Sequence, residues 1–281
     1  MRILNKIALA AILISVFVYT PTVHAATSAT LGTVGSYSVL GHTTVTNTGS
    51  TTMPGDLGVS IGGAPTGFPP GSVGPPGSIR NAGDSLAAQN ANTAAFGFID
   101  QGCDTTYAGT KDLVGENLVA GVYCANAFQL SGTLTLSGTG VWIFKSASSL
   151  IPSGTANVSG GDACNVWWRV VSSATLGTNT SLIGNILAST SIALATNASL
   201  NGRALAQTGA VTLDANVITG SACLTASQSS GSGDATTTPG LPNAGADTQS
   251  QNSNLGNALI ATSILASIAI AAYIFRKRQT N

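Results

Sequence analysis

The chain has 281 residues, of which only 7% are charged, and its formal net charge at pH 7 is zero. The chain has no excess of Lys and Arg with which to bind phosphate groups, so the composition argues against a nucleic-acid partner. Hydrophobic residues make up 43% of the chain and arrive in short runs between small polar residues, which favours an ordered, mostly β domain over a disordered chain.

Residues 1–25 predict an export signal. Arg2 and Lys6 flank the start of an apolar core over 7–19, and Val23-His24-Ala25 offers a small-x-small cleavage site. The alternative is an uncleaved anchor helix, for which the apolar core is short. We therefore expect an extracellular mature protein that begins after this site.

The next stretch, 27–80, alternates enough to predict short strands, followed by an irregular Pro- and Gly-rich loop over 62–80. A helix is predicted over 81–102, with Asn81 or Ser78 as the cap, Asp84 in the first turn and Gly102 at the end. The side chains expected to lie against the rest of the domain are Ala82, Leu86, Thr93, Phe96 and Ile99.

Residues 141–220 read as four similar units, and strand-like segments precede them over 113–136. Gly184, Gly202 and Gly220 lie 18 residues apart, and each closes a unit with three short apolar runs. Three strands of three to five residues with their corners make one coil of a β-solenoid, which is favoured over a β-sandwich because the units are short for full hairpins. The aligned positions are Ile143, Trp168, Ile186 and Ala204 in the first run, Leu150, Leu176, Leu194 and Leu213 in the second, and Val158, Leu182, Leu200 and Ile218 in the third. Trp142, Trp167 and Trp168 are expected mainly in the core.

A Ser/Gly/Thr-rich linker is predicted over 224–257, followed by an apolar run over 258–275 and a basic tail over 276–281. The run is long enough to span a bilayer, with the basic tail on the cytoplasmic side. Together with Leu241-Pro242-Asn243-Ala244-Gly245, these segments resemble a Gram-positive cell-wall sorting signal, in which a sortase links the protein to peptidoglycan. Ala244 replaces the usual Thr, so a permanent membrane anchor and sortase attachment both remain open.

Four cysteines follow the signal, an even number that predicts two disulfides in an exported chain. Three pairings are possible, and the favoured one joins Cys103 to Cys124 and Cys164 to Cys223. With no CxxC pair and His42 as the sole histidine after the signal, no metal site or cofactor is expected.

Catalysis is not expected, because the ionisable residues are scattered over different units and His42 is expected at a corner or on the surface. Those in the repeats are Lys145, Asp162, Arg169, Arg203 and Asp214. The turn from the second run to the third instead repeats small hydroxyl residues. Stacked about 4.7–4.9 Å apart, they would form a stiff ladder. The candidate site residues are Thr48, Thr51, Ser153, Thr155, Thr178, Thr180, Ser181, Thr196 and Ser199.

A rigid, uncharged ladder of hydroxyls and methyls suits ordered water, because methyl groups order adjacent water and hydroxyls hydrogen-bond to it. The alternative is that small residues simply fit tight corners. Asp214 is the exception to the uncharged pattern.

Many segments resemble, in order, the ice-binding-like family of bacterial, fungal and microalgal proteins. They are SYSVLGHTTVTNTGSTTMPGDLGVSIG, TGFPPG, ENLVAGVY, GTLTLSGTGVWIF, ACNVWW, SSATLGTNTSLIGNILASTSI and LNGRALAQTGAVTLDANVIT, within a domain over 26–223. The resemblance implies an all-β fold with one long α-helix: a right-handed discontinuous β-solenoid of triangular section, with the helix packed along one flank and coils contributed by the N-terminal strands.

The family binds ice through one flat face that commonly bears T-A/G-x-T/N motifs. Thr48-Gly49-Ser50-Thr51 matches the motif, Thr178-Asn179-Thr180-Ser181 and Thr196-Asn197-Ala198-Ser199 match in part, and the turn at Asp214 departs from it. Two functions follow. The first is a cell-surface ice-binding (antifreeze) protein that inhibits ice growth or recrystallisation or attaches the cell to ice; the second is a non-enzymatic cell-surface adhesin or structural domain that binds glycan or protein.

Overall fold

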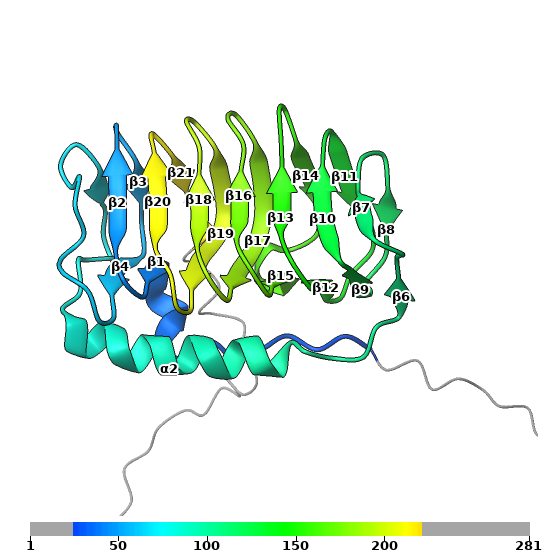
Figure 1. Ribbon diagram of the computed structural model, residues 1–281, viewed down its shortest axis with the longest axis horizontal. Coiled ribbons are helices and arrows are strands. Elements are labelled where there is room, and N and C mark those ends of the chain that lie inside the picture. The colour runs from blue at the N-terminus through cyan, green and yellow to red at the C-terminus, as the bar shows by residue number, and fades with distance from the viewer. Residues whose placement is uncertain (1–24, 221–281) are drawn as a thin grey trace, which may run out of the picture. The chain divides into compact units, whose positions relative to one another are not determined.

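The computed structural model describes residues 25–220, which form a stack of parallel β-coils with an α-helix along its side (Figure 1). Each coil passes through three short strands separated by corners, and every strand pair is parallel. The strands thereby form three ladders, which we call faces A, B and C.

Face B is the seven-stranded sheet turned toward the viewer in Figure 1. In stack order it consists of β2 (Val45–Thr48), β20 (Val211–Asp214), β18 (Ile192–Leu194), β16 (Ala174–Leu176), β13 (Leu150–Pro152), β10 (Ala127–Leu130) and β7 (Thr110–Asp112).

Faces A and C belong to one larger sheet, because β17 (Ser181–Ala188) and β19 (Ser199–Ala206) run from face C into face A. Face A also contains β4 (Asp56–Val59), β1 (Tyr37–Gly41), β15 (Val166–Val170), β12 (Trp142–Ser146), β9 (Gly121–Ala125) and β6 (Thr105–Thr106). Face C also contains β5 (Ser72–Val73), β3 (Thr52–Met53), β21 (Val217–Ile218), β14 (Asn157–Gly160), β11 (Thr133–Leu136) and β8 (Asn117–Leu118).

The interior of the coils is apolar because alternate residues of each strand point inward. Tyr123, Phe144 and Trp168 are register partners that stack on one another, with ring centroids 5.5 Å and 4.2 Å apart. Such aromatic pairs contribute about 0.5–1.5 kcal/mol each beyond the area that they bury. The prediction that the three Trp are core residues is confirmed, since Trp142, Trp167 and Trp168 are all buried.

The register of the repeats agrees with the prediction in the third run, where Asn157 pairs with Ser181 and Leu182 pairs with Leu200. Two predicted partners in the first unit are wrong. Phe144 rather than Ile143 aligns with Trp168, and Leu150 aligns with Ala174. The first unit is longer than the others, because its last corner holds the 3₁₀ turn η3 (Ala163–Asn165).

The glycines spaced 18 residues apart stack at the corner between faces C and A. Gly184 pairs with Gly202, and a Cβ added to Gly202 would lie 1.8 Å from the Gly184 carbonyl oxygen. A Cβ on Gly220 would similarly lie 2.2 Å from the Cα of Gly202. We call this corner the A/C vertex. Only glycine allows the coils to approach so closely there.

The N-terminal strands stack on the last coil of the repeat rather than on the strands that follow them in sequence. Strand β1 pairs with β19, β2 with β20 and β3 with β21. Beyond them, β4, Thr66 and β5 complete a further coil, and Ile79 bridges to Leu57. The prediction of a wholly irregular loop over 62–80 is therefore wrong, since parts of this Pro-rich segment pair with the stack.

The helix, α2, spans Ala82–Phe98 and lies along the stack beneath face A (Figure 1). Asn81 caps it by accepting a hydrogen bond from the Asp84 amide, and Asp84 lies in the first turn as predicted. The helix ends at Phe98 instead of Gly102.

The predicted inner face of α2 is largely wrong. Ile99 is buried and Phe96 half-buried, but Ala82, Leu86 and Thr93 are exposed. The buried side chains of the helix are Ser85, Ala88, Gln89, Asn92 and Ala95. The polar ones serve strand ends that face A leaves unpaired: Gln89 Nε2 donates to the Gln207 carbonyl (3.0 Å), and Asn92 Nδ2 lies 3.5 Å from that of Ala206. A buried carbonyl requires such a donor.

Charged groups fix the C-terminal end of α2. Asp100 forms ion pairs with Lys145 Nζ at 2.6 Å and Arg169 Nη2 at 2.9 Å. Arg169 Nε also donates to the Phe96 carbonyl, and its guanidinium lies over the Phe96 ring. Cations at this end complement the partial negative charge of the helix C-terminus.

A buried arginine ties the 3₁₀ turn η2 (Gly32–Ser36) to β19. Arg203 is fully buried; its Nε and Nη2 donate to the Gly35 carbonyl at 3.1 and 2.7 Å, and Nη1 donates to Asn185 Oδ1 at 3.0 Å. Burial lowers the pKa of Arg203 to about 10.

The disulfide between Cys103 and Cys124 is confirmed. Cys164 is disulfide-bonded too, but its predicted partner, Cys223, lies outside the described residues. The export signal, the linker with its sorting-like motif, the apolar run over 258–275 and the basic tail also lie outside them. Over 25–220, no helix combines the length and hydropathy needed to cross a bilayer.

Candidate functional site

The nine residues predicted as a site do not lie on one face. Five are exposed along the corner between faces B and C, which we call the B/C vertex: Thr48, Ser153, Thr155, Thr178 and Thr196. Ser181 and Ser199 are half-buried at the start of face C, and Thr51 and Thr180 are buried. The predicted ladder therefore follows an edge of the stack and continues partly into the core.

The backbone of the B/C vertex explains this split. The second residue of each motif has a left-handed conformation, with φ of 59° at Asn179, 60° at Asn197 and 76° at Gly49. Gly and Asn are the residues that adopt it most readily, so the motif describes a turn. Past the turn the chain heads inward, which buries Thr180 and Thr51. The Thr51 hydroxyl accepts from the Asn216 amide at 3.0 Å. These two threonines are removed from the candidate surface.

The flattest uncharged surface lies beside that vertex, on the outward side of face B. Its strands pair in register without a shift, so the outward side chains form straight rows across the coils. The middle row is Thr46, Thr212, Ala193, Thr175, Ile151 and Gln129; the rows beside it include Thr44, Ala210, Ser191 and Ser173 on one side and Thr48, Asp214, Ala195 and Gly177 on the other.

From β2 to β16, face B therefore presents Ser, Thr, Ala and Gly, with Asp214 as its charged residue. Asp214 lies at the edge, where its Oδ2 accepts a hydrogen bond from the Thr196 hydroxyl at 2.5 Å. Toward β7 the surface changes, because Ile151 and Gln129 are larger and the next residue of their row is the charged Asp112. The smooth part of face B thus covers the half of the stack nearer β2.

Sequence reasoning missed this surface because it followed the corners. A signal was present: in Val45-Thr46, Ile192-Ala193 and Val211-Thr212, a small residue follows each buried β-branched one. Strand alternation places that small residue outside.

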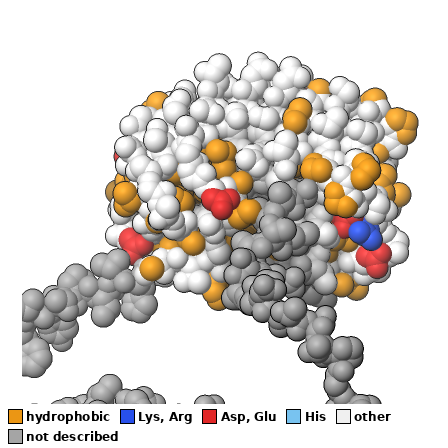
Figure 2. All heavy atoms as spheres, turned by 180° about the vertical axis from the view of Figure 1, so that it is seen from behind, with side chains coloured by type: hydrophobic (Ala, Val, Ile, Leu, Met, Phe, Trp, Pro, Cys, Tyr) orange, Lys and Arg blue, Asp and Glu red, His pale blue; other side chains and the backbone are white. Residues whose placement is uncertain are grey.

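Face C is also low in charge, but its outward side chains differ in size. Ile183 and Val217 alternate with Ser199 and Asn201 along neighbouring strands. Figure 2, which shows the domain from the side opposite to Figure 1, displays scattered hydrophobic side chains and few charged ones. Face C is therefore less even than face B.

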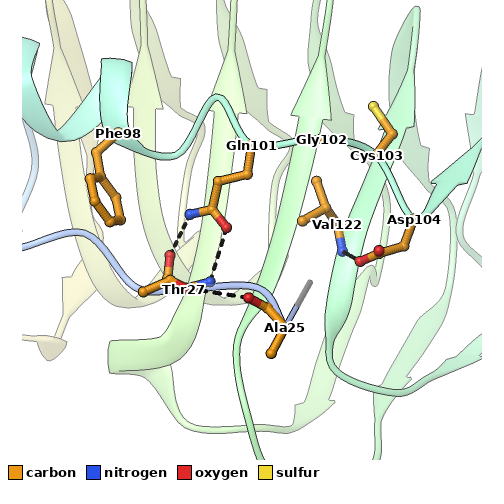
Figure 3. A pocket seen from close by; sticks show the side chains of 8 residues that line it. All are labelled: Ala25, Thr27, Phe98, Gln101, Gly102, Cys103, Asp104 and Val122. Carbon is orange, nitrogen blue, oxygen red and sulfur yellow. Dashed lines mark hydrogen bonds between the residues drawn. The ribbon is translucent and has the colours of Figure 1, made fainter. Parts of the chain in front are cut away.

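The hollow drawn in Figure 3 lies between the end of α2 and β9, and its polar groups bond to each other. Gln101 accepts from the Thr27 amide at 3.0 Å and donates to the Thr27 carbonyl at 2.6 Å, while Asp104 accepts from the Val122 amide at 2.8 Å. These bonds hold the N-terminal segment against the stack. His42 lies at a corner, with Nδ1 2.9 Å from Ser60 Oγ.

Within 25–220, no three His, Cys, Asp or Glu residues gather where they could hold a metal ion. The geometry defines a class of protein: a stack of parallel β-coils with one flat, nearly uncharged face.

The chain belongs to the ice-binding-like family, whose model matches residues 39–219. It is 39% identical to an ice-binding protein of Nostoc sp. (strain HG1), over 81% of this chain and 87% of the relative. It is 33% identical to an ice-binding protein of Flavobacterium frigoris (strain PS1), over 67% of this chain and 75% of the relative.

Among solved structures, the ice-binding protein of the Antarctic ascomycete Antarctomyces psychrotrophicus matches with a TM-score of 0.65 and 38% identity. The match covers 69% of this chain and 98% of that one. A chain made of little more than this domain therefore folds on its own.

Proposed function

We propose that the protein binds ice through the smooth part of face B and thereby restrains ice growth or recrystallisation. The observation that carries the proposal is the set of straight rows of Ser, Thr, Ala and Gly from β2 to β16, on a face that no other described element covers. Membership of the ice-binding-like family and the names of the relatives support it. The activity proposed is adsorption, not catalysis.

The physical basis is the match between an ordered surface and ordered water. Rungs about 4.7–4.9 Å apart repeat the same outward group along the stack. The methyl groups of Thr46, Thr175 and Thr212 face water and order it, while their hydroxyls hydrogen-bond to part of it. Each contact is weak, so activity depends on many rungs acting together. Charged groups bind their own hydration water, so Asp214 is expected to weaken adsorption.

Of the residues predicted from sequence, Thr48 belongs to the proposed surface, and Ser153 borders face B just beyond it, at the end of β13. Thr155, Thr178 and Thr196 lie at the B/C vertex, on the rim of face B, whereas Ser181 and Ser199 are the first residues of their strands in face C.

A tyrosine scan of the two faces tests the proposal in residues 26–240. Thr175→Tyr places a bulky ring in the middle of face B and should abolish ice shaping and recrystallisation inhibition. Asn201→Tyr, at an exposed position on face C, is the matched control and should retain both. Asp214→Thr should increase activity. Melting temperatures of all variants should stay close to that of the parent, which separates loss of binding from loss of fold.

Two results would count against this assignment. Equal activity of Thr175→Tyr and Asn201→Tyr would show that face B is not the contact. Ordinary disc-shaped ice growth with the unmodified domain would favour the second function, a non-enzymatic adhesin or structural domain that binds glycan or protein.

The proposal includes the setting that the sequence indicates. The leader over 1–25, the linker over 224–257 with Leu241-Pro242-Asn243-Ala244-Gly245, the apolar run over 258–275 and the basic tail support display outside a cell, either on the membrane or on peptidoglycan after sortase cleavage. We also propose that the domain is a right-handed, discontinuous β-solenoid of triangular section.

A further inference from the structure

Both ends of the described domain lie on the side away from face B. At the C-terminal end, the last coil runs along face A, then face B, then face C, and reaches Gly220 at the A/C vertex, stacked on Gly202. Cys164 occupies the same vertex one coil away from Gly184, in the turn between β14 of face C and β15 of face A, and is disulfide-bonded.

The N-terminal segment reaches this side as well. The Ser28 hydroxyl donates to Asn165 Oδ1 at 2.9 Å and accepts from Trp167 Nε1 at 3.2 Å. Thr27 is held by the two hydrogen bonds to Gln101 (Figure 3). The segment that follows the predicted cleavage site is thus fixed beside face A, next to the A/C vertex.

In a coil with three sides, the vertex between two faces points away from the third. The A/C vertex is therefore the part of each coil farthest from face B. The ion pairs of Asp56 with Arg80 and of Asp100 with Lys145 and Arg169 also lie on the side of face A. Three of the four ion pairs among the described residues and the point where the chain leaves the stack therefore lie on the side of face A, and the smooth part of face B lies on the opposite side.

We propose that the domain binds ice while it is held through the segment after Gly220, with face B turned away from the attachment. This inference rests on the proposed function and deepens it, because it specifies how face B is oriented relative to the segment through which the domain is attached to its carrier. An attachment at the B/C vertex would instead place the carrier beside the ice-contact surface and obstruct it.

The test compares attachment points on one domain, residues 26–240, coupled to streptavidin beads. One sample carries biotin on a C-terminal tag. Two others carry biotin on a single added cysteine, Asn90→Cys on the exposed side of α2 or Thr155→Cys at the B/C vertex. Beads coupled through the C-terminus or Asn90→Cys should be captured by a growing ice surface, and beads coupled through Thr155→Cys should lose capture.

The free domains, without beads, are measured alongside. If the free unmodified domain does not adsorb to ice, the proposed function fails. If it adsorbs but the C-terminally coupled beads are not captured, or if Thr155→Cys beads are captured equally well, the inference is overturned while the function stands. The free Thr155→Cys protein without biotin is measured as well, and the capture of its beads is compared with its own adsorption, which separates a loss caused by the attachment from a loss caused by the substitution.

Discussion

Replacing Arg203 by Met should destabilise the domain, although it removes a buried charge whose hydrogen-bond acceptors are a carbonyl and a side-chain amide, not a carboxylate. The lowering of its pKa to about 10 by burial corresponds to a desolvation cost of about 3 kcal/mol. The three hydrogen bonds to Gly35 and Asn185 oppose it, at about 1.5–3 kcal/mol each for a charged donor. The bonds outweigh the desolvation, so Arg203→Met should lower the free energy of unfolding by about 2–5 kcal/mol.

The assay is denaturant unfolding of residues 26–240 at fixed pH, supported by thermal melts. For a domain of this size the loss corresponds to a melting temperature lower by about 10 °C. Arg203→Lys keeps the charge but loses the planar fork, so it should be at least as unstable as the Met variant. A Met variant that melts at or above the parent temperature would refute the reasoning, because it would mean that burial of the charge dominates.

Two further predictions concern the glycine column and the ion pairs at the end of α2. Gly202→Ala should prevent folding or lower the melting temperature sharply, since its Cβ would lie 1.8 Å from the Gly184 carbonyl oxygen. The control is Gly97→Ala, at an open position of the helix, which should stabilise the domain by about 0.5–1 kcal/mol. Equal melting temperatures of the two variants would contradict the close approach of the coils. The hydrogen bond from Lys145, aided by the charge of Arg169, lowers the pKa of Asp100 below 3.8. The stability contributed by the Asp100 carboxylate is therefore present above pH 3.8 and lost as the pH falls through the lowered pKa of the folded protein. Asp100→Asn should flatten this part of the acid unfolding curve. An unchanged curve would show that the carboxylate contributes nothing to stability.

The coil repeat could be predicted from sequence because it depends on local alternation and on glycine spacing. Gly184, Gly202 and Gly220 mark real contacts between coils, and Val158, Leu182, Leu200 and Ile218 fall in register. Register failed where a corner changed length, as it does at η3. Periodicity fixes which residues point inward, but not how many residues a corner holds.

The inner face of α2 could not be predicted from apolar periodicity. Leu86 is 48% exposed, while Gln89 and Asn92 are buried. The helix packs against strand ends whose carbonyl groups need hydrogen-bond donors, so polar side chains face inward. The sequence of the helix alone does not indicate which part of the domain it will cover. The pairing of the segment over 62–80 was missed for a related reason. Its few β-bridges are made to parallel strands elsewhere in the sequence, and its prolines indicate a loop rather than a strand.

The proposed surface has the composition predicted for the candidate site, but it lies beside most of the residues that the sequence indicated. The repeated Thr, Asn and Gly residues of the motifs mark a left-handed turn, and their regularity reflects backbone geometry at Asn179 and Asn197. The even surface next to them is carried by single small residues such as Ala193 and Thr175, which are inconspicuous in sequence because each is flanked by core residues.

The stacking of β1, β2 and β3 on β19, β20 and β21 has a consequence for biosynthesis. The strands that the ribosome makes first can cover their apolar side only when almost the whole domain has been made. In the proposed export of the chain across a membrane, premature closure is therefore disfavoured, and completion of the core coincides with arrival on the far side.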